Sequence, residues 1–133
     1  MQSKMITNRA KAQQILAFDG LKFGKCSCTD IDVSMDWQGK TFIFVEIKTE
    51  GSPLTRGQQY HLQGLVNGLR AGGKTAYAIV AKHQTPLKHD VHVAECRTHS
   101  VYAGNSWELI PTNERLSVTI DGLYAEHLEE YGA

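Results

Sequence analysis

The fold of this chain is decided by residues 29–49, which read TDIDVSMDWQGKTFIFVEIKT. Apolar and polar residues alternate on both sides of Gln38-Gly39-Lys40, which is the pattern of two β-strands joined by a turn. We therefore expect a β-hairpin from residue 29 to residue 49. Successive side chains of a strand point to opposite faces of the sheet. The polar residues of the first strand should therefore share one face: Asp30, Asp32, Ser34 and Asp36.

The return strand carries Glu46 and Lys48 on one face, at the end of an otherwise apolar run. A strand that only fills a core has no need of a carboxylate and an ammonium group there. Antiparallel pairing with the first strand would bring Glu46 close to Asp32 or Asp30. The hairpin therefore predicts that two or three carboxylates and one lysine converge at a single point.

Length and charge limit what the protein can be. A chain of 133 residues suits a single domain spanning residues 1–133, and it can bury a core without disulfides. The formal net charge is zero, with 14 basic and 14 acidic residues, so no overall field would attract the protein to nucleic acid or to a membrane. Contact with nucleic acid would need a local patch in which metal ions offset the phosphate charge.

The cysteines and the apolar runs indicate a cytoplasmic protein with no membrane partner. The odd count of three cysteines, without C-x-x-C spacing, argues against a disulfide scaffold and a zinc knuckle. Cys26 and Cys28 are interpreted as buried thiols of a strand. No apolar run approaches the ~20 residues that span a bilayer, and the N-terminus lacks the apolar core of a signal peptide.

Two helices are expected on either side of the hairpin. Asn8 can cap a helix over residues 9–18, which has an apolar stripe. After a turn that contains Pro53, Thr55 is predicted to cap a second helix from about residue 56 to residue 69 or 70. Leucine and valine recur along this second helix at spacings of three and four residues, which gives it one buried face.

The rest of the chain predicts further strands and a last helix. Residues 76–81 are apolar almost throughout, which favours a central strand covered on both faces. A helix that joins this strand to the hairpin makes a right-handed crossover between parallel strands. Residues 91–102 can form one or two strands, residues 107–110 another, and residues 116–120 lead into a helix over 121–131. The expected class is α/β, with a mixed central sheet flanked by helices.

The charged residues of the hairpin follow a pattern that resembles a known superfamily. Asp32, thirteen intervening residues and then Glu46-Ile47-Lys48 resemble the PD-(D/E)XK nucleases. The resemblance continues through the predicted helix start, residues 54–58, which ends in Gln58. It covers roughly residues 26–83 and is similar to virus-type replication-repair nucleases and to small nuclease-like proteins of phages and prophages. It implies a restriction-endonuclease-like core in α-β-β-α-β order, with the C-terminal strands and helix as additions.

The resemblance implies a Mg²⁺- or Mn²⁺-dependent deoxyribonuclease, encoded by a phage or prophage. Hydrolysis of a phosphodiester needs a hard cation at the phosphate, an attacking water and positive charge near the developing anion. Mg²⁺ prefers oxygen ligands and keeps several waters, so few protein ligands suffice. DNA is the implied substrate, and a homodimer would suit a branched DNA that has two equivalent strands.

The roles of individual residues are also carried by the resemblance. Asp32 and Glu46 are the implied metal ligands and catalytic carboxylates, with the carbonyl of Ile47 as a third ligand. Asp30, on the same strand face as Asp32, is a reserve or auxiliary ligand. Lys48 and Gln58 complete the implied catalytic set.

Lys48 and Gln58 would support the attack on phosphorus in different ways. Lys48 could orient the water or stabilise the phosphorane-like charge. Gln58 could position the water or a phosphate as a neutral hydrogen-bonding group.

Other interpretations of these residues remain open. The predicted first helix offers Gln13 and Gln14 but no glutamate, which many relatives carry there. The alternative function is therefore a catalytically weak or inactive nuclease-fold protein that binds DNA or a host protein. A simpler interpretation makes Glu46 and Lys48 an exposed salt bridge. The two tryptophans of the chain are interpreted as packing residues rather than platforms for base stacking.

Overall fold

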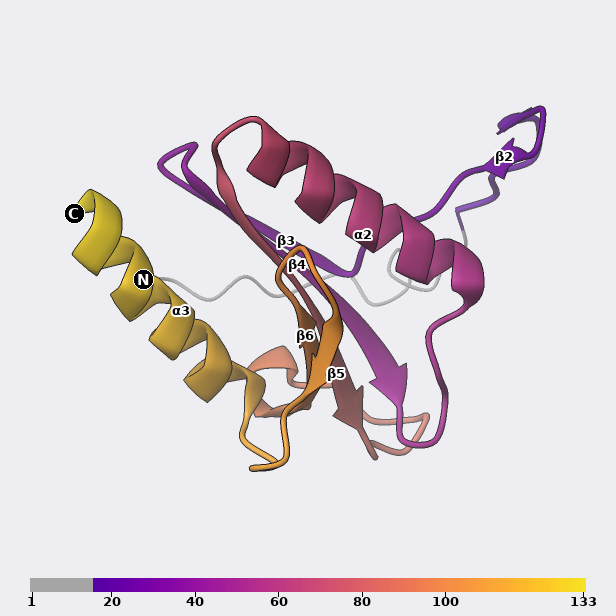
Figure 1. Ribbon diagram of the computed structural model, residues 1–133. Helices are drawn as coiled ribbons and strands as arrows, with labels where there is room; N and C mark the ends of the chain where they lie inside the picture. The colour runs from indigo at the N-terminus through magenta and orange to yellow at the C-terminus, as the bar shows by residue number, and fades with distance from the viewer. Residues whose placement is uncertain (1–15) are drawn as a thin grey trace.

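The computed structural model describes residues 16–133 and has an α/β architecture, a five-stranded mixed sheet with a helix on each face (Figure 1). The strands are β3 (Val33–Trp37), β4 (Thr41–Thr49), β5 (Thr75–His83), β6 (Arg97–Tyr102) and β7 (Trp107–Leu109). The helices are α2 (Arg56–Ala71), α3 (Leu116–Tyr131) and the short 3₁₀ helix η1 (Val93–Glu95). Strands follow one another across the sheet in chain order. β4 and β5 are parallel, and every other neighbouring pair is antiparallel.

The expected hairpin is confirmed as β3 and β4, with Val33 opposite Val45 and Trp37 opposite Thr41. Residues 38–40 form the loop; Gln38 and Gly39 both have positive φ, 61° and 67°, and the Lys40 N–H donates to the Trp37 carbonyl at 3.0 Å, which makes a tight turn. Asp36 accepts a hydrogen bond from the Gly39 N–H at 2.7 Å, so this carboxylate stabilises the turn. The turn fixes the register and therefore the face on which every hairpin side chain lies.

Helix α2 is the expected crossover between the parallel strands β4 and β5. It begins with a capping box, in which Thr55 and Gln58 each accept from the other's backbone N–H. Leu62 and Val66 are its buried residues, and they pack against one face of the sheet. The apolar cluster on this face comprises Phe44, Leu62, Val66, Ala76, Ala78 and Tyr102.

Helix α3 covers the opposite face, as Figure 1 shows. Its contacts there are led by Leu116, which is fully buried. The cluster on this face comprises Ile43, Val45, Ile79, Ala81, Cys96 and Leu116. The central strands β4 and β5 are therefore covered on both sides, as the apolar run at residues 76–81 predicts.

The last helix begins at Leu116, and the expected start near Asp121 is wrong. Val118, Thr119 and Ile120 are β-branched residues that favour strands, but packing overrides this weak preference. Leu116, Ile120 and Leu123 recur at helical spacing and all contact the sheet. Residues 91–102 contain one strand, β6 over Arg97–Tyr102, which follows η1.

The N-terminal expectations have mixed outcomes. The helix expected over residues 9–18 lies mostly outside the described residues, and residues 16–18 are not helical. A small antiparallel pair, β1 (Lys22–Phe23) with β2 (Cys26–Ser27), projects from the body of the molecule (Figure 1). Cys26 and Cys28 are exposed, so their expected burial is wrong. Among residues 16–133 no helix has the length and hydropathy needed to cross a membrane.

Candidate functional site

Asp32 lies one residue before β3, next to the last ladder pair of Val33 with Val45, and its side chain contacts that of Glu46. Asp32 Oδ2 accepts a hydrogen bond from the backbone N–H of Ile47 at 2.7 Å. This bond holds the Asp32 carboxylate against β4 at the point where β3 ends. Asp32 is exposed, whereas the Glu46 side chain is only 4% exposed.

Glu46 has an unusual electrostatic environment. Its pKa is raised from 4.5 to about 8, first by burial, then by a hydrogen bond with Asp32 and by the charge of that carboxylate. Lys48 acts in the opposite direction and lowers the pKa, while Asp30 contributes the smallest increase. Asp32 is therefore the direct partner of Glu46, whereas Lys48 and Asp30 act on it through their charge alone.

The oxygen atoms at this point have the chemistry of a site for a hard divalent cation. Within residues 16–133 no three His, Cys, Asp or Glu side chains form a group that could hold a metal ion. The ligand set would therefore be Asp32 and Glu46, with the carbonyl of Ile47 beside them. Mg²⁺ is often held by one or two carboxylates because it keeps several waters. A cation would also offset the repulsion that raises the pKa of Glu46.

Lys82 is a second lysine at the site, which the sequence prediction missed. It pairs with Lys48 in the parallel register of β4 and β5, so both side chains lie on the face covered by α2. Its side chain is 8% exposed, and its Nζ donates to the carbonyl of Ser52. A signal for it was present, because Lys82 directly follows the apolar run and the carboxyl ends of parallel strands share one edge.

Gln58 lies at the start of α2, where the sequence places it, but its side chain has a structural role. Its Oε1 accepts from the backbone N–H of Thr55 at 3.1 Å, and its own N–H donates to Thr55 Oγ1 at 3.1 Å. This capping box uses the carbonyl end of the side chain. The amide nitrogen is the end that can still donate to a substrate.

A hollow of about 400 Å³ lies on the same face of the sheet, beyond β5. We call it the Trp107 hollow. It lies between the loop that leads into α2 and the strands β5, β6 and β7. Its lining comprises Glu50, Gly51, Pro53, Leu54, Gln59, Val80, Lys82, His99, Ser100 and Trp107.

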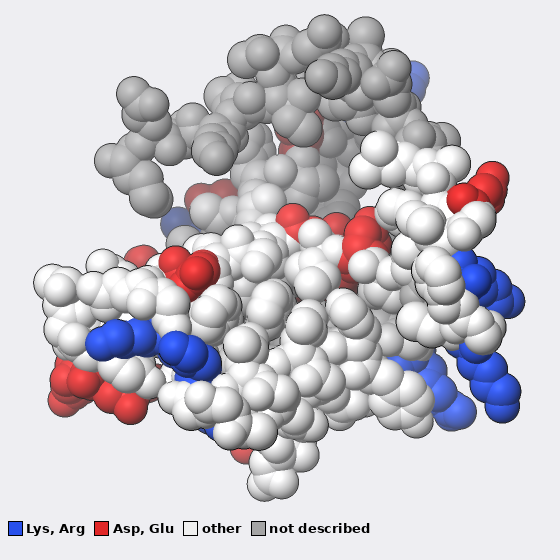
Figure 2. Space-filling model, turned by 90° about the horizontal axis from the view of Figure 1, so that it is seen from above, with Lys and Arg blue, Asp and Glu red and all other residues white. Residues whose placement is uncertain are grey.

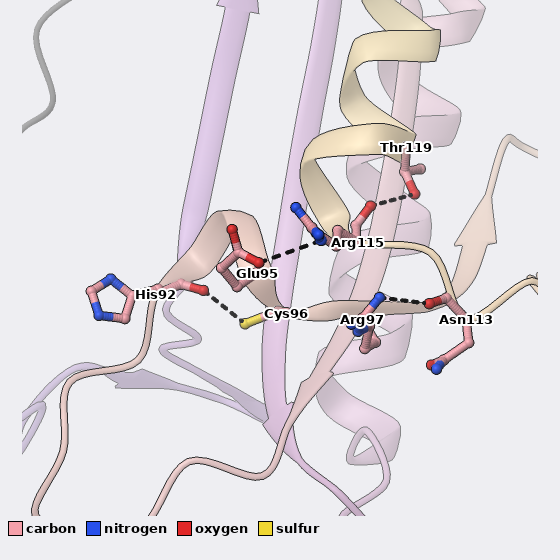
Figure 3. Close-up of polar contacts among 7 residues, drawn as sticks. All are labelled: His92, Glu95, Cys96, Arg97, Asn113, Arg115 and Thr119. Carbon is pink, nitrogen blue, oxygen red and sulfur yellow. Dashed lines mark hydrogen bonds and ion pairs between the residues drawn. The ribbon is translucent and has the colours of Figure 1, made fainter.

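A second hollow, of about 370 Å³, lies past the carboxyl ends of β4 and β5. We call it the Arg97 hollow; its lining comprises Glu50, Lys82, His83, Gln84, Thr85, His92, Glu95, Cys96, Arg97 and Asn113. Figure 3 shows the contacts beside it, in which Arg97 Nη1 donates to the Asn113 carbonyl at 3.1 Å and Arg115 pairs with Glu95 at 3.4 Å. These contacts link η1 and β6 to the segment that leads into α3. Lys82 lines both hollows.

The charges on the surface do not form one continuous basic area on the face drawn in Figure 2. Lys and Arg side chains gather in separate groups toward its two sides, and Asp and Glu side chains lie both between these groups and beside them. A polyanion that approached this face would meet carboxylates as well as cations. Cations bound at the carboxylates would reduce that repulsion.

Comparison with protein families, with curated proteins and with solved structures found no match for this chain.

Proposed function

We propose that the protein is a Mg²⁺- or Mn²⁺-dependent nuclease that hydrolyses phosphodiester bonds of DNA, with a restriction-endonuclease-like core. The observation that carries the proposal is the apposition of Asp32 with buried Glu46, next to Lys48, at the open end of the β3–β4 hairpin. Two neighbouring carboxylates repel each other, and a cation bound between them would remove this repulsion. The resemblance to small nuclease-like proteins of phages and prophages gives the same residues the same roles.

Each residue of the site has a separate task in this proposal. Asp32 and Glu46 would hold the cation, with Ile47 carbonyl as a third ligand and Asp30 as an auxiliary carboxylate. A bound divalent cation supplies Lewis-acid polarisation of the phosphate and a more acidic water. The hydrogen bond from Ile47 N–H fixes the Asp32 carboxylate before any ligand arrives.

The nitrogen groups around the carboxylates would stabilise the transition state. The ammonium group of Lys48 would offset the negative charge that develops on the phosphate oxygens. Lys82 lies beside Lys48 in the register, so it adds positive charge on the same face. Gln58 would donate its amide N–H to a phosphate or to the attacking water, while its carbonyl oxygen stays in the capping box.

A second candidate function is a protein with this fold that binds DNA or a host protein without cleaving it. It is favoured by the arrangement of the acidic side chains, since among residues 16–133 neither Asp30 nor any other acidic or histidine side chain completes a three-residue metal group with Asp32 and Glu46. It is also favoured by the engagement of Gln58 in the capping box. Binding of this kind would need no divalent cation and would survive the loss of Glu46.

The test is cleavage of labelled single-stranded, nicked, branched and duplex DNA by the purified protein with Mn²⁺ or Mg²⁺. We expect cleavage of at least one substrate, lost on addition of a chelator and in the variants Glu46→Ala and Lys48→Ala. Asp36→Asn is the matched control, since Asp36 lies on the same strand face as Asp32 but at the far end of the hairpin. Cleavage that persists in both alanine variants would reject the assigned site. Metal-independent binding without cleavage would favour the second function.

A further inference from the structure

Strand β6 contains a bulge that faces the Trp107 hollow. Val80 pairs with Ser100, but the next residue, Ala81, pairs with Thr98, so His99 is the extra residue. In a regular strand Thr98 and Ser100 would share a face. Here Thr98 contacts α3, with its Oγ1 2.5 Å from that of Thr119, while Ser100 lines the hollow on the α2 side.

The bulge brings two adjacent polar side chains to one hollow. His99 Nδ1 lies 3.2 Å from Ser100 Oγ, so the pair forms a small hydrogen-bonding group on the hollow's wall. Bulges commonly redirect side chains beside functional sites. The neighbouring walls supply apolar contact through Val80 and Leu54 and an amide through Gln59.

Trp107 provides the clearest indication that a ligand occupies this hollow. Its indole N–H is buried and has no hydrogen-bond partner in the described part of the chain. Buried donors without a partner are rare in native proteins and call for an explanation. The ring is held in place by Tyr102, whose ring centroid lies 5.4 Å away and whose hydroxyl donates to Asn67 at 2.9 Å. The N–H has almost no accessible surface, so a ligand with an acceptor atom would satisfy it once the indole ring turns toward the hollow.

The register connects the hollow to the carboxylates. The Asp32 side chain contacts that of Glu46, Glu46 pairs with Val80, and Val80 pairs with Ser100, which makes one row across the sheet. Adjacent strands lie about 4.8 Å apart, so Ser100 lies about 10 Å from Glu46 along this row. That span is comparable with the distance from a phosphate group to the far edge of the base in one nucleotide.

We propose that the Trp107 hollow receives one unpaired base of the substrate, from a nucleotide next to the phosphate held at Asp32, Glu46 and Lys48. The proposal rests on the nuclease function. Trp107 N–H donates to an acceptor on the base edge, His99 and Ser100 contact the same edge, and the apolar wall packs against the ring. A base in a regular duplex is stacked and paired, so entry into the hollow selects single strands, flaps or branched DNA.

The first experiment uses Trp107 as a reporter. The variant Trp37→Phe leaves Trp107 as the sole tryptophan of the chain. It is titrated, with Ca²⁺ in place of Mn²⁺, with a short thymidine oligonucleotide and with an all-abasic strand of equal length and charge. We expect the thymidine strand to change the Trp107 emission and to bind about tenfold more tightly than the abasic strand.

The second experiment measures binding of fluorescent versions of both strands by anisotropy. Ser100→Leu fills the hollow and should lower the affinity for the thymidine strand to that for the abasic strand. Ser34→Leu, at an exposed serine of β3, is the matched control and should leave both affinities unchanged. Trp107→Phe keeps an aromatic ring of smaller size and removes the N–H. It should weaken binding of the thymidine strand alone, and it covers the case in which Ser100→Leu fails to fold.

Equal affinity for the two strands, with no change in Trp107 emission, would overturn the proposal. The nuclease function is judged separately by Glu46-dependent cleavage with Mn²⁺. Glu46-dependent cleavage by a protein that binds both strands equally would support the nuclease function and reject the base site. Base-dependent binding without cleavage would keep the base site and reject the nuclease.

Discussion

Strand β4 has a buried polar side chain near each end, Thr41 and Glu46. The two side chains differ in the groups to which they are hydrogen-bonded. At the first end, Thr41 Oγ1 lies 2.6 Å from His127 Nδ1, and His127 Nε2 lies 2.9 Å from Gln38 Oε1. His127 is 4% exposed and lies among the rings of Trp37 and Tyr131. Both ring nitrogens are therefore satisfied by neutral oxygens. This end joins the hairpin turn to α3.

At the other end, buried Glu46 has another carboxylate as its nearest partner. Its neighbour Asp32 raises the Glu46 pKa together with burial, and Lys48 only partly offsets the effect. The two ends are equally buried, so burial alone does not distinguish a structural group from a functional one. What distinguishes them is how their polar groups are satisfied. The His127 end is satisfied within the protein, whereas under the proposed function a cation would satisfy the carboxylates at the Glu46 end.

The substitution Glu46→Gln should have the largest effect, and that effect is on the rate of DNA cleavage. The amide keeps the size of the side chain but removes the charge that would hold the cation, so we expect cleavage to fall by more than about 100-fold. His127→Gln, at the other end of the same strand, should retain cleavage within about twofold per folded molecule. Rates measured with Mn²⁺ under single-turnover conditions decide this. Equal losses in the two variants would remove the distinction between the ends of β4.

The second-largest expected effect is on the pH dependence of the free energy of unfolding, to which the Glu46 end of β4 should contribute. The pKa of Glu46 is about 8 in the folded protein and 4.5 for an ordinary carboxyl group. Between these values the folded state retains a proton that the unfolded state has released, so the contribution of Glu46 is full below pH 4.5 and is lost as pH rises to about 8.

Urea unfolding of the wild type and of Glu46→Gln from pH 4 to pH 9 measures this contribution without metal. The difference in free energy of unfolding between them should change by about 5 kcal/mol over that interval, with the wild type losing stability as pH rises. A constant difference would show that Glu46 titrates normally.

The His127 end should matter for stability and little for chemistry. Replacing the ring by Ala leaves Thr41 and Gln38 without partners and opens space among the aromatic rings. We expect His127→Ala to lower the free energy of unfolding by about 2 kcal/mol. Thermal and urea unfolding measure the loss, and Tyr124→Ala, at the exposed edge of the same aromatic group, should cost less. An unchanged stability would mean that the hydrogen bonds of His127 contribute nothing.

The smallest effect concerns Gln58, which carries one structural and one proposed catalytic role. Gln58→Ala removes half of the capping box and should lower the free energy of unfolding by about 1 kcal/mol. Gln58→Glu keeps a capping-box residue, so its stability should stay near the wild type. If the amide contacts phosphate, Gln58→Glu still lowers cleavage, because it replaces a donor by a negative charge. Full cleavage activity in Gln58→Glu would show that Gln58 caps the helix and has no role in catalysis.

The hairpin and its carboxylates could be predicted because their determinants are local. Alternation over residues 29–49 fixes which side chains share a face, and the turn at Gln38 and Gly39 fixes the register. Once the register is known, Asp32 must lie close to Glu46. The crossover helix and parallel strand β5 follow from the periodicity of residues 56–70 and the apolar run after it.

The remaining features depend on contacts between residues distant in the chain. The bulge at His99 comes from the way β6 pairs with β5, and no local pattern marks it. The start of α3 at Leu116 depends on packing against the sheet, which overrides the strand preference of its first turn. Lys82 directly follows the apolar run, but its place beside Lys48 depends on the parallel pairing of β4 with β5. The capping role of Gln58 was encoded locally, in the spacing from Thr55, but the resemblance directed the interpretation to catalysis instead.

The most direct test of the central claim is a calorimetric titration of the metal-free protein with Mn²⁺ at pH 7.5. We expect a saturable binding signal in the wild type and in two controls, Asp36→Asn and His127→Gln. We expect loss of that signal in Asp32→Asn and in Glu46→Gln, because each removes one of the two carboxylates that contact each other across the hairpin. Binding that is unchanged in both of these variants, or absent from the wild type, would contradict the claim that this end of β4 is a metal site.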